Sequence, residues 1–131
     1  MKALKAVLIA VLAVVCTTVL LMVSVAAVFV YEEKFKKTEV YRECDPNGAY
    51  VFVLYEIGEP VWAFGPVKAR IAVLDSRGKT VVKQDLSLNN DGSHVHELNV
   101  EALRWREGAL EVQLKGFDDE EKTTYTLSFD A

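Results

Sequence analysis

Residues 6–30 contain no charged residue, no proline and no glycine, and this run constrains the chain more than any other segment. In an α-helix these 25 residues span roughly 37 Å. The hydrocarbon core of a bilayer is about 30 Å thick, and a signal peptide needs only about 7–15 apolar residues. Tyr31 follows at the edge, where its amphipathic ring suits the headgroup layer. We therefore predict a five-residue tail (1–5) and a transmembrane signal anchor over residues 6–30.

The same segment leaves cleavage and orientation open. Lys2 and Lys5 form a basic N-terminal region, and the small residues from Ser24 to Ala27 suit a signal-peptide cleavage site, which would give a secreted protein. Basic residues also follow the run, so their count alone favours a C-terminal side inside the cell. The short lysine-bearing tail instead resembles an export signal. We expect a single-pass membrane protein whose C-terminal domain is extracytoplasmic.

The rest of the chain is long enough for one small domain. Residues 31–131 hold thirteen basic and nineteen acidic residues, a formal net charge of −6. Such a domain is expected to bind neither nucleic acid nor an anionic bilayer surface, because phosphates would repel it. Cys16 lies in the apolar run and cannot pair with Cys44, so no internal disulfide is expected. Cys44 is interpreted as a small buried residue rather than as an intermolecular disulfide partner.

Turn signals and apolar runs predict a mainly β domain over residues 44–131, after a juxtamembrane linker over 31–43. Residues 49–57 are mostly apolar at both odd and even positions, which point to opposite faces of a strand. This indicates a strand covered on both faces. The last two strands instead alternate apolar and polar residues, as in an antiparallel sheet covered on one face. Six or seven short strands at this spacing predict a small antiparallel β-sandwich. The predicted strands are 49–57, 67–75, 80–86, 94–100, 110–114 and 124–129, and residues 101–105 either extend the fourth of these strands or form a short helical turn.

The loop between the first two of these strands carries two large aromatic residues, Trp62 and Phe64, between prolines. If exposed, they are natural anchors for a protein partner or a sugar face. If they fold back, they close the end of the sandwich instead. We name them as the candidate binding residues.

His94 and His96 are the only histidines. At positions i and i+2 of a strand they would project from one face and could supply two metal ligands, with Asp91 and Glu97 near in sequence. A catalytic zinc site needs three protein ligands, and no third histidine is present. Structural or surface roles are therefore the main interpretation, metal binding is the alternative, and no cofactor is expected.

No catalytic constellation can be assembled from the sequence. No nucleophile-elbow motif surrounds any serine, and no phosphate-binding glycine loop is present. The acidic run over residues 118–121 could bind calcium, but its acids are consecutive and lack a glycine bend, so a solvated turn is favoured. These observations favour a non-enzymatic domain.

Several motifs resemble those of a group of small, uncharacterised bacterial proteins that are exported or membrane-anchored and carry a C-terminal β-domain. The matching residues lie within 44–129 and are Pro46-Asn47-Gly48-Ala49-Tyr50, Trp62, Phe64-Gly65-Pro66, Asn90-Asp91-Gly92 and the segment 112–116. The resemblance implies a compact β-domain behind an N-terminal membrane segment. It implies no activity, cofactor or catalytic residue.

The sequence thus favours a membrane-anchored, non-catalytic protein-interaction module whose protein partner is unknown. A metal-binding protein or metal-dependent enzyme using His94 and His96 is one alternative. The other is an accessory subunit of a membrane complex, docked through small residues of the helix, although no Gly-x-x-x-Gly is present. These small residues are Ala3, Ala6, Ala10, Ala13 and Ala26.

Overall fold

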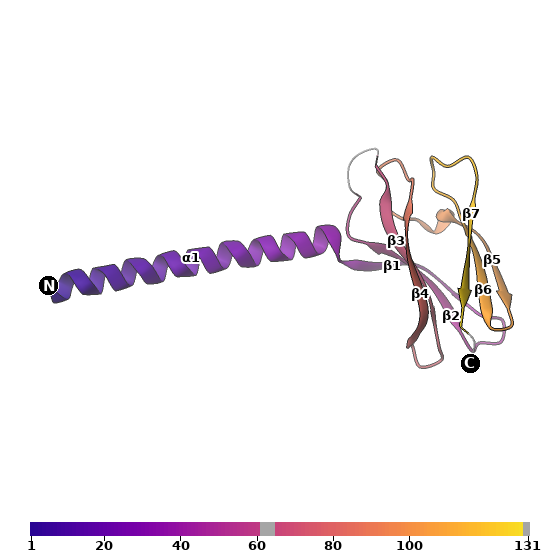
Figure 1. Ribbon diagram of the computed structural model, residues 1–131, viewed down its shortest axis with the longest axis horizontal. Helices are drawn as coiled ribbons and strands as arrows, with labels where there is room; N and C mark the ends of the chain where they lie inside the picture. Colours follow the sequence, from indigo (N-terminus) through magenta and orange to yellow (C-terminus); the bar gives the residue numbers. More distant parts are fainter. Residues whose placement is uncertain (61–64, 130–131) are drawn as a thin grey trace.

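The computed structural model describes residues 1–60 and 65–129, in which one long helix leads into a two-layer β-domain (Figure 1). The helix, α1, runs Lys2–Lys34 and is about 50 Å long. The hydroxyl groups of Thr17, Thr18 and Ser24 each donate a hydrogen bond to the carbonyl four residues earlier, which satisfies them inside an apolar helix. The N-terminal apolar helix is confirmed, and it includes most of the residues predicted as a separate tail.

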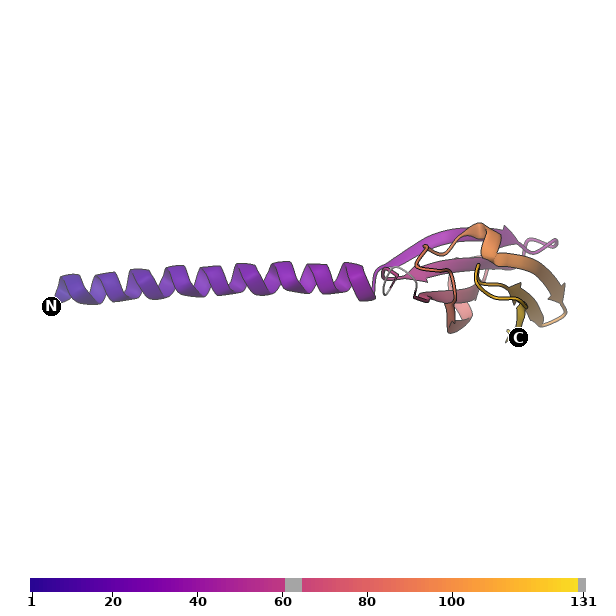
Figure 2. The ribbon, with the colours of Figure 1, turned by 90° about the horizontal axis from the view of Figure 1, so that it is seen from above.

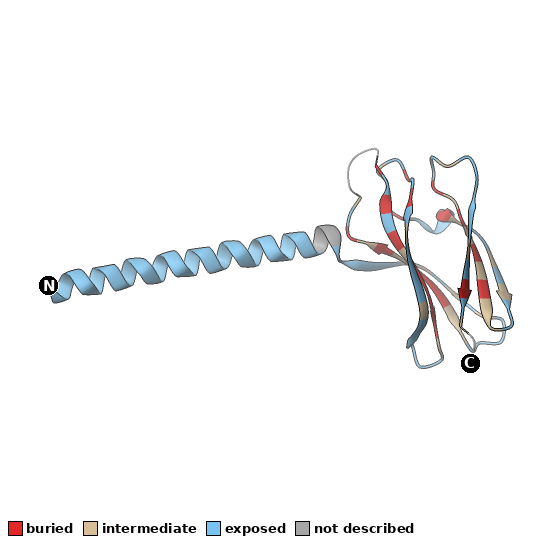
Figure 3. Ribbon diagram, viewed as in Figure 1, coloured by how far each residue is buried: buried red, intermediate tan, exposed pale blue. Residues whose placement is uncertain are grey.

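The described side chains of α1 are all exposed (Figure 3). The helix projects away from the β-domain, with the N-terminus at its far end (Figure 1). Its 30-residue apolar stretch, Lys2–Tyr31, therefore buries none of its surface against the described part of this chain. Water is an unfavourable environment for so large a continuous apolar surface.

The β-domain contains seven antiparallel strands in two sheets, as the sequence predicted. The four-stranded sheet has the order β1-β2-β3-β4 and the three-stranded sheet the order β5-β6-β7. Each connection within a sheet joins neighbouring strands through a short turn or loop, so both sheets are meanders. The strands are β1 (Lys37–Cys44), β2 (Val51–Ile57), β3 (Val67–Leu74), β4 (Thr80–Leu88), β5 (Val100–Arg106), β6 (Ala109–Leu114) and β7 (Thr123–Ser128).

The core lies between the two sheets, where Figure 3 shows the buried residues. β2, β3 and β6 contribute most of it, because alternate residues of each strand point inward. Phe52, Val53 and Leu54 have no exposed surface, so residues at both odd and even positions of β2 are buried, but only Phe52 and Leu54 face the second sheet, whereas Val53 packs with side chains of its own sheet. The main core residues are Phe52, Leu54, Val67, Ala69, Ile71, Val73, Leu88, Val95, Leu110, Val112, Leu114 and Leu127.

Three local expectations differ from the structure. Residues 37–43, expected within the juxtamembrane linker, belong to strand β1 and pair with β2. Residues 94–100, expected as a strand, form an irregular segment followed by a 3-10 turn, η1 (Glu97–Asn99), before β5 begins. Cys44 is exposed on edge strand β1 rather than buried. Only one neighbouring strand covers an edge position, and a pattern of apolar residues does not reveal which strand is at the edge.

We expect Phe52→Ala to lower the free energy of unfolding by about 3–5 kcal/mol, because the ring is fully buried between the sheets and its removal leaves a cavity. Phe117→Ala is the matched control: its ring is 48% exposed, and we expect a loss of about 1 kcal/mol or less. Urea unfolding of the full chain in detergent, followed by intrinsic tryptophan fluorescence, measures both. Equal losses would contradict the described core.

Candidate functional site

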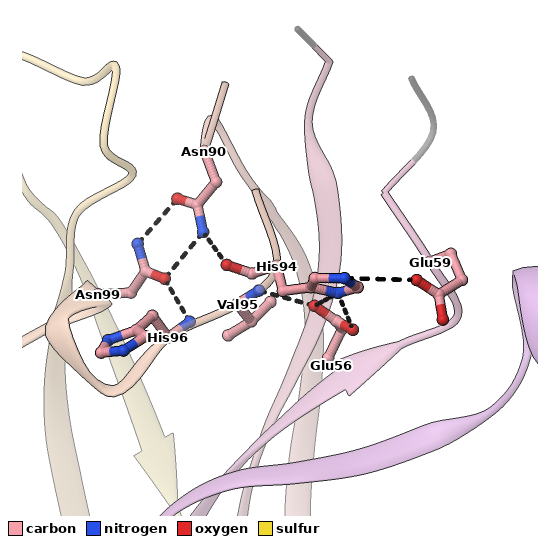
Figure 4. Close-up of polar contacts among 7 residues, drawn as sticks. All are labelled: Glu56, Glu59, Asn90, His94, Val95, His96 and Asn99. Atoms are coloured by element: carbon pink, nitrogen blue, oxygen red, sulfur yellow. Dashed lines mark hydrogen bonds and ion pairs between the residues drawn. The ribbon is translucent and has the colours of Figure 1, made fainter. Parts of the chain in front are cut away.

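The chain passes from the four-stranded to the three-stranded sheet through residues 89–99, which we call the crossover. The two polar clusters drawn in Figure 4 gather on this segment. One joins the crossover to Glu56 and Glu59, and the other joins its two ends through Asn90 and Asn99. Polar side chains that converge on one irregular segment are the strongest candidate for chemistry in the described residues.

Glu56 is the buried centre of the first cluster. It lies near the end of β2 at the same parity as Phe52 and Leu54, so its side chain points between the sheets and is 7% exposed. One carboxylate oxygen accepts a hydrogen bond from Val95 N at 2.7 Å, and both oxygens lie within 3.0 Å of His94 Nδ1. A buried carboxylate is tolerated only with such partners. Glu56 therefore attaches the crossover to the end of β2.

His94 lies between two carboxylates. Its Nδ1 faces Glu56 at 2.8 Å, and its Nε2 lies 3.7 Å from Glu59 Oε2, which extends from the loop after β2 (Figure 4). The hydrogen bond to Glu56 raises the pKa of His94; its partial burial opposes this, and the negative charges of Glu56 and Glu59 add to the increase. The arrangement favours an imidazolium whose two N–H groups point at opposite carboxylates.

The same three residues bring one ligand atom each to within 4.8 Å of one another, close enough to consider a metal ion. However, one imidazole ring offers a given ion only one nitrogen, and here each carboxylate faces a different nitrogen. Glu56 is also engaged by Val95 N. The observed contacts therefore fit ion pairing better than metal coordination, which would require Glu59 or the ring to move.

His96 has a different role from His94. Its Nδ1 accepts a hydrogen bond from Leu98 N at 3.1 Å, so the ring caps η1. The two rings point in different directions in Figure 4, and His96 is not among the residues that converge on Glu56. Metal binding by His94 and His96 as a pair stays a prediction. The irregular backbone of residues 93–96 removes the strand alternation on which it was based.

Asn90 and Asn99 form the second cluster and are fully buried. Each side-chain amide donates to the other's carbonyl oxygen, at 2.9 and 2.8 Å. The remaining amide positions bond four backbone groups, His94 O, His96 N, Lys115 O and Phe117 N. The pair thus holds both ends of the crossover to each other and to the segment that follows β6.

The predicted binding residues Trp62 and Phe64 lie outside the described residues. The chain on their C-terminal side is attached to the crossover, because Gly92 N donates a hydrogen bond to Gly65 O at 3.0 Å. Glu59, on the N-terminal side, lies beside His94. The loop that carries the two aromatics therefore starts and ends next to the crossover.

The acidic segment after β6 also has a structural role. Asp119 accepts hydrogen bonds from Asn89 Nδ2 at 2.8 Å and from Gly116 N at 3.0 Å. Its oxygens therefore close the turn and attach it to the start of the crossover. This arrangement agrees with the interpretation of the acidic run as turn chemistry rather than as a calcium loop.

The first cluster can hold a proton, but it lacks the other parts of a nucleophilic site. Within residues 1–60 and 65–129, no serine, threonine or cysteine side chain hydrogen-bonds either nitrogen of His94. The ring side chain is 64% exposed, so water surrounds most of it. A nucleophile–base pair is therefore not assembled in the described part of the chain.

Glu56 and Asn99 are the site residues that sequence reasoning missed. Glu56 had a signal: it is the one acid in the strand Val51–Ile57, at the inward parity. Asn99 had none, since its partner Asn90 is nine residues away and the connection depends on the path of the crossover.

Asn90→Ala should lower the free energy of unfolding by about 2–4 kcal/mol, because it removes one partner each from the buried amide nitrogen and oxygen of Asn99 and the side-chain partners of His94 O and Phe117 N. Asn47→Ala, in an exposed turn, is the matched control and should cost less than about 1 kcal/mol. Chemical denaturation of the full chain measures both. A near-neutral Asn90→Ala would show that the pair does not hold the crossover.

The ion pair at His94 should make stability depend on pH. Because the pKa of His94 is raised in the folded state, its contribution is fully present below the unfolded value of about 6.5 and is lost as pH rises through the folded pKa. We expect the midpoint of urea unfolding to fall between about pH 6 and pH 8. His94→Gln should flatten this part of the profile, whereas His96→Asn, which keeps a capping side chain, should not. An unchanged slope in His94→Gln would refute the pairing.

The chain was compared with protein-family models, curated proteins and solved structures, and none of these matches it. Its function is therefore inferred from its own residues and contacts.

Proposed function

We propose that this protein is a single-pass, membrane-anchored β-sandwich that acts at the extracytoplasmic surface as a non-catalytic interaction module. The observation that carries the proposal is the helix α1, whose apolar stretch Lys2–Tyr31 is covered by no described part of the chain. A bilayer is the environment that covers such a surface on all sides.

The length and composition of α1 support an anchor. The stretch of 30 residues exceeds the about 20 needed to cross the hydrocarbon core, so it can span with tilt. Its few hydroxyl groups are bonded to the helix itself and cost little in lipid. A cleaved signal peptide remains the alternative, and it would yield a secreted domain.

The junction between helix and sandwich supports a module held close to the bilayer. Only Phe35 and Lys36 separate α1 from β1. The backbone N–H groups of both residues donate to Tyr31 O at 2.8 Å, and Lys36 O accepts from Gly58 N at 2.7 Å. The junction is thus bonded to the helix on one side and to the loop after β2 on the other. This short connection leaves the domain little freedom to move away from the surface.

The polar clusters support a structural role for their side chains rather than an enzymatic one. The groups of Glu56, Asn90 and Asn99 are used to attach the crossover. Trp62 and Phe64 stay the predicted contacts for a protein partner, and a subunit role in a larger membrane complex would use the helix instead.

Membrane fractionation of the full-length chain tests the anchor. We expect it to stay in the membrane pellet after alkaline carbonate extraction, with an intact mass that includes the N-terminal segment. A double variant, Leu12→Arg with Val19→Arg, should be extracted, because each charge costs about 2.5–3.5 kcal/mol at the helix centre. Leu12→Ala with Val19→Ala is the control and should remain in the pellet. A mature chain that begins after residue 26 would refute the anchor and support secretion.

A further inference from the structure

We infer that the outer face of the four-stranded sheet binds the anionic headgroups of the membrane that holds the protein. This inference rests on the proposed anchor. It identifies a positively charged surface that the negative net charge of the whole domain does not reveal.

The outer face is identified by the strand register. Val53 pairs with Arg42 on one side and with Ala72 on the other, and Ala72 pairs with Lys83, so these four side chains share one face. A second row has the same alternation: Tyr55 lies between Glu39 and Arg70, and Asp85 follows. The charged residues on this face are Lys37, Glu39, Arg42, Lys68, Arg70, Lys83 and Asp85.

The charge of this face is opposite to that of the domain. Five basic and two acidic side chains give it a formal charge of +3, whereas residues 31–131 together carry −6. Both acids are paired with arginines of the same face, Glu39 with Arg42 at 2.6 Å and Asp85 with Arg70. Lys68 and Lys83 make no ion pair among the described residues. The unneutralised charge of the face is therefore positive and belongs to its lysines.

The centre of the face is apolar and is partly covered by these cations. Val53 and Ala72 have at most 1% of their surface exposed, although no second layer of the described residues covers them. Lys37 Nζ lies 4.5 Å from the centre of the Tyr55 ring, and a groove of about 440 Å³ runs beside it. Long basic side chains over an apolar floor suit a headgroup layer, where apolar and anionic groups meet.

The position of the face favours the bilayer as its partner. Figure 1 shows the four-stranded sheet on the helix side of the domain and the three-stranded sheet on the far side, and Figure 2 shows β1 running on from the end of α1. The outer face is thus turned toward the side from which α1 arrives, and Lys37 is three residues beyond the last residue of the helix. The anchor therefore presents this face to the headgroups at a high effective concentration. An acidic protein partner would have to compete with these headgroups for the outer face.

Lysine labelling on the full-length chain in lipid nanodiscs tests the inference. One set of discs contains only phosphatidylcholine, and the other contains about one-third phosphatidylglycerol. We expect acetylation of Lys68 and Lys83 to be about fivefold slower in the anionic discs, while that of the exposed Lys122 is unchanged. About 1 M salt should remove the difference, because it screens exposed charges. Equal labelling in both discs would overturn the inference.

Two single variants provide a matched comparison, with Lys68 as the reporter. Lys83→Glu removes a cation from the face and should reduce the protection of Lys68 by anionic lipid. Lys122→Glu makes the same charge change elsewhere and should leave that protection intact. Equal effects of the two variants would show that net charge, rather than this face, governs the contact.

The labelling pattern also separates a lipid surface from an acidic polypeptide and from a failed anchor. If soluble polyglutamate protects Lys68 and Lys83 in neutral discs and anionic lipid does not, the face binds acidic polypeptides and the lipid inference is wrong. If the chain does not co-purify with discs of either composition, the anchor itself fails. If it co-purifies with both and its labelling is equal, the anchor stands and only the lipid-binding face is refuted.

Discussion

The burial of polar groups in the crossover is the constraint on which the sandwich depends. Residues 89–99 are the only described connection between the two sheets, and an irregular segment in that place cannot satisfy its backbone through a β-ladder. Asn90, Asn99 and Glu56 supply the missing partners. These three side chains hold the crossover against the two sheets, whose apolar residues pack as one core.

The same constraint accounts for the lack of an assembled active site among the most conspicuous polar residues of the described chain. A carboxylate beside a histidine is a common catalytic pair. Here, however, Glu56 also accepts a hydrogen bond from Val95 N, and its side chain is buried near the end of β2. Glu59 faces the second nitrogen of His94. The cluster is therefore a structural attachment that carries a charge and a proton, and we expect the stability of the fold to respond to pH through it.

The proposed anchor and the proposed lipid-binding face together connect the fold to the membrane. The junction between α1 and β1 is only two residues long, so in this proposal it sets which side of the domain meets the bilayer. Charge that is averaged over residues 31–131 predicts repulsion from anionic lipid. The register of the four strands β1, β2, β3 and β4 places the cations on one face of the sheet. The net charge of the whole domain therefore does not describe that face.

Much of the fold could be predicted from local pattern. The helix and most of the strands were found because apolar periodicity and turn residues are properties of neighbouring positions. The strand β1 was missed, because its exposed edge lacks the apolar alternation of a covered strand, and Lys37 to Cys44 has the composition of a charged linker. Residues 94–96 were misassigned as a strand because alternation of histidine and apolar residues fits a half-buried strand and a capped turn equally well.

By itself, the sequence determined the apolar helix, the β class of the domain, the central buried strand and the absence of an internal disulfide partner for Cys44. These depend on the composition and order of neighbouring residues. Only the tertiary structure decided that Glu56 meets His94 across 38 residues, that Asn90 meets Asn99, and which cations share a face. Those pairings depend on strand register and on the path of the crossover, and a one-residue shift in register would move every side chain of a strand to the opposite face.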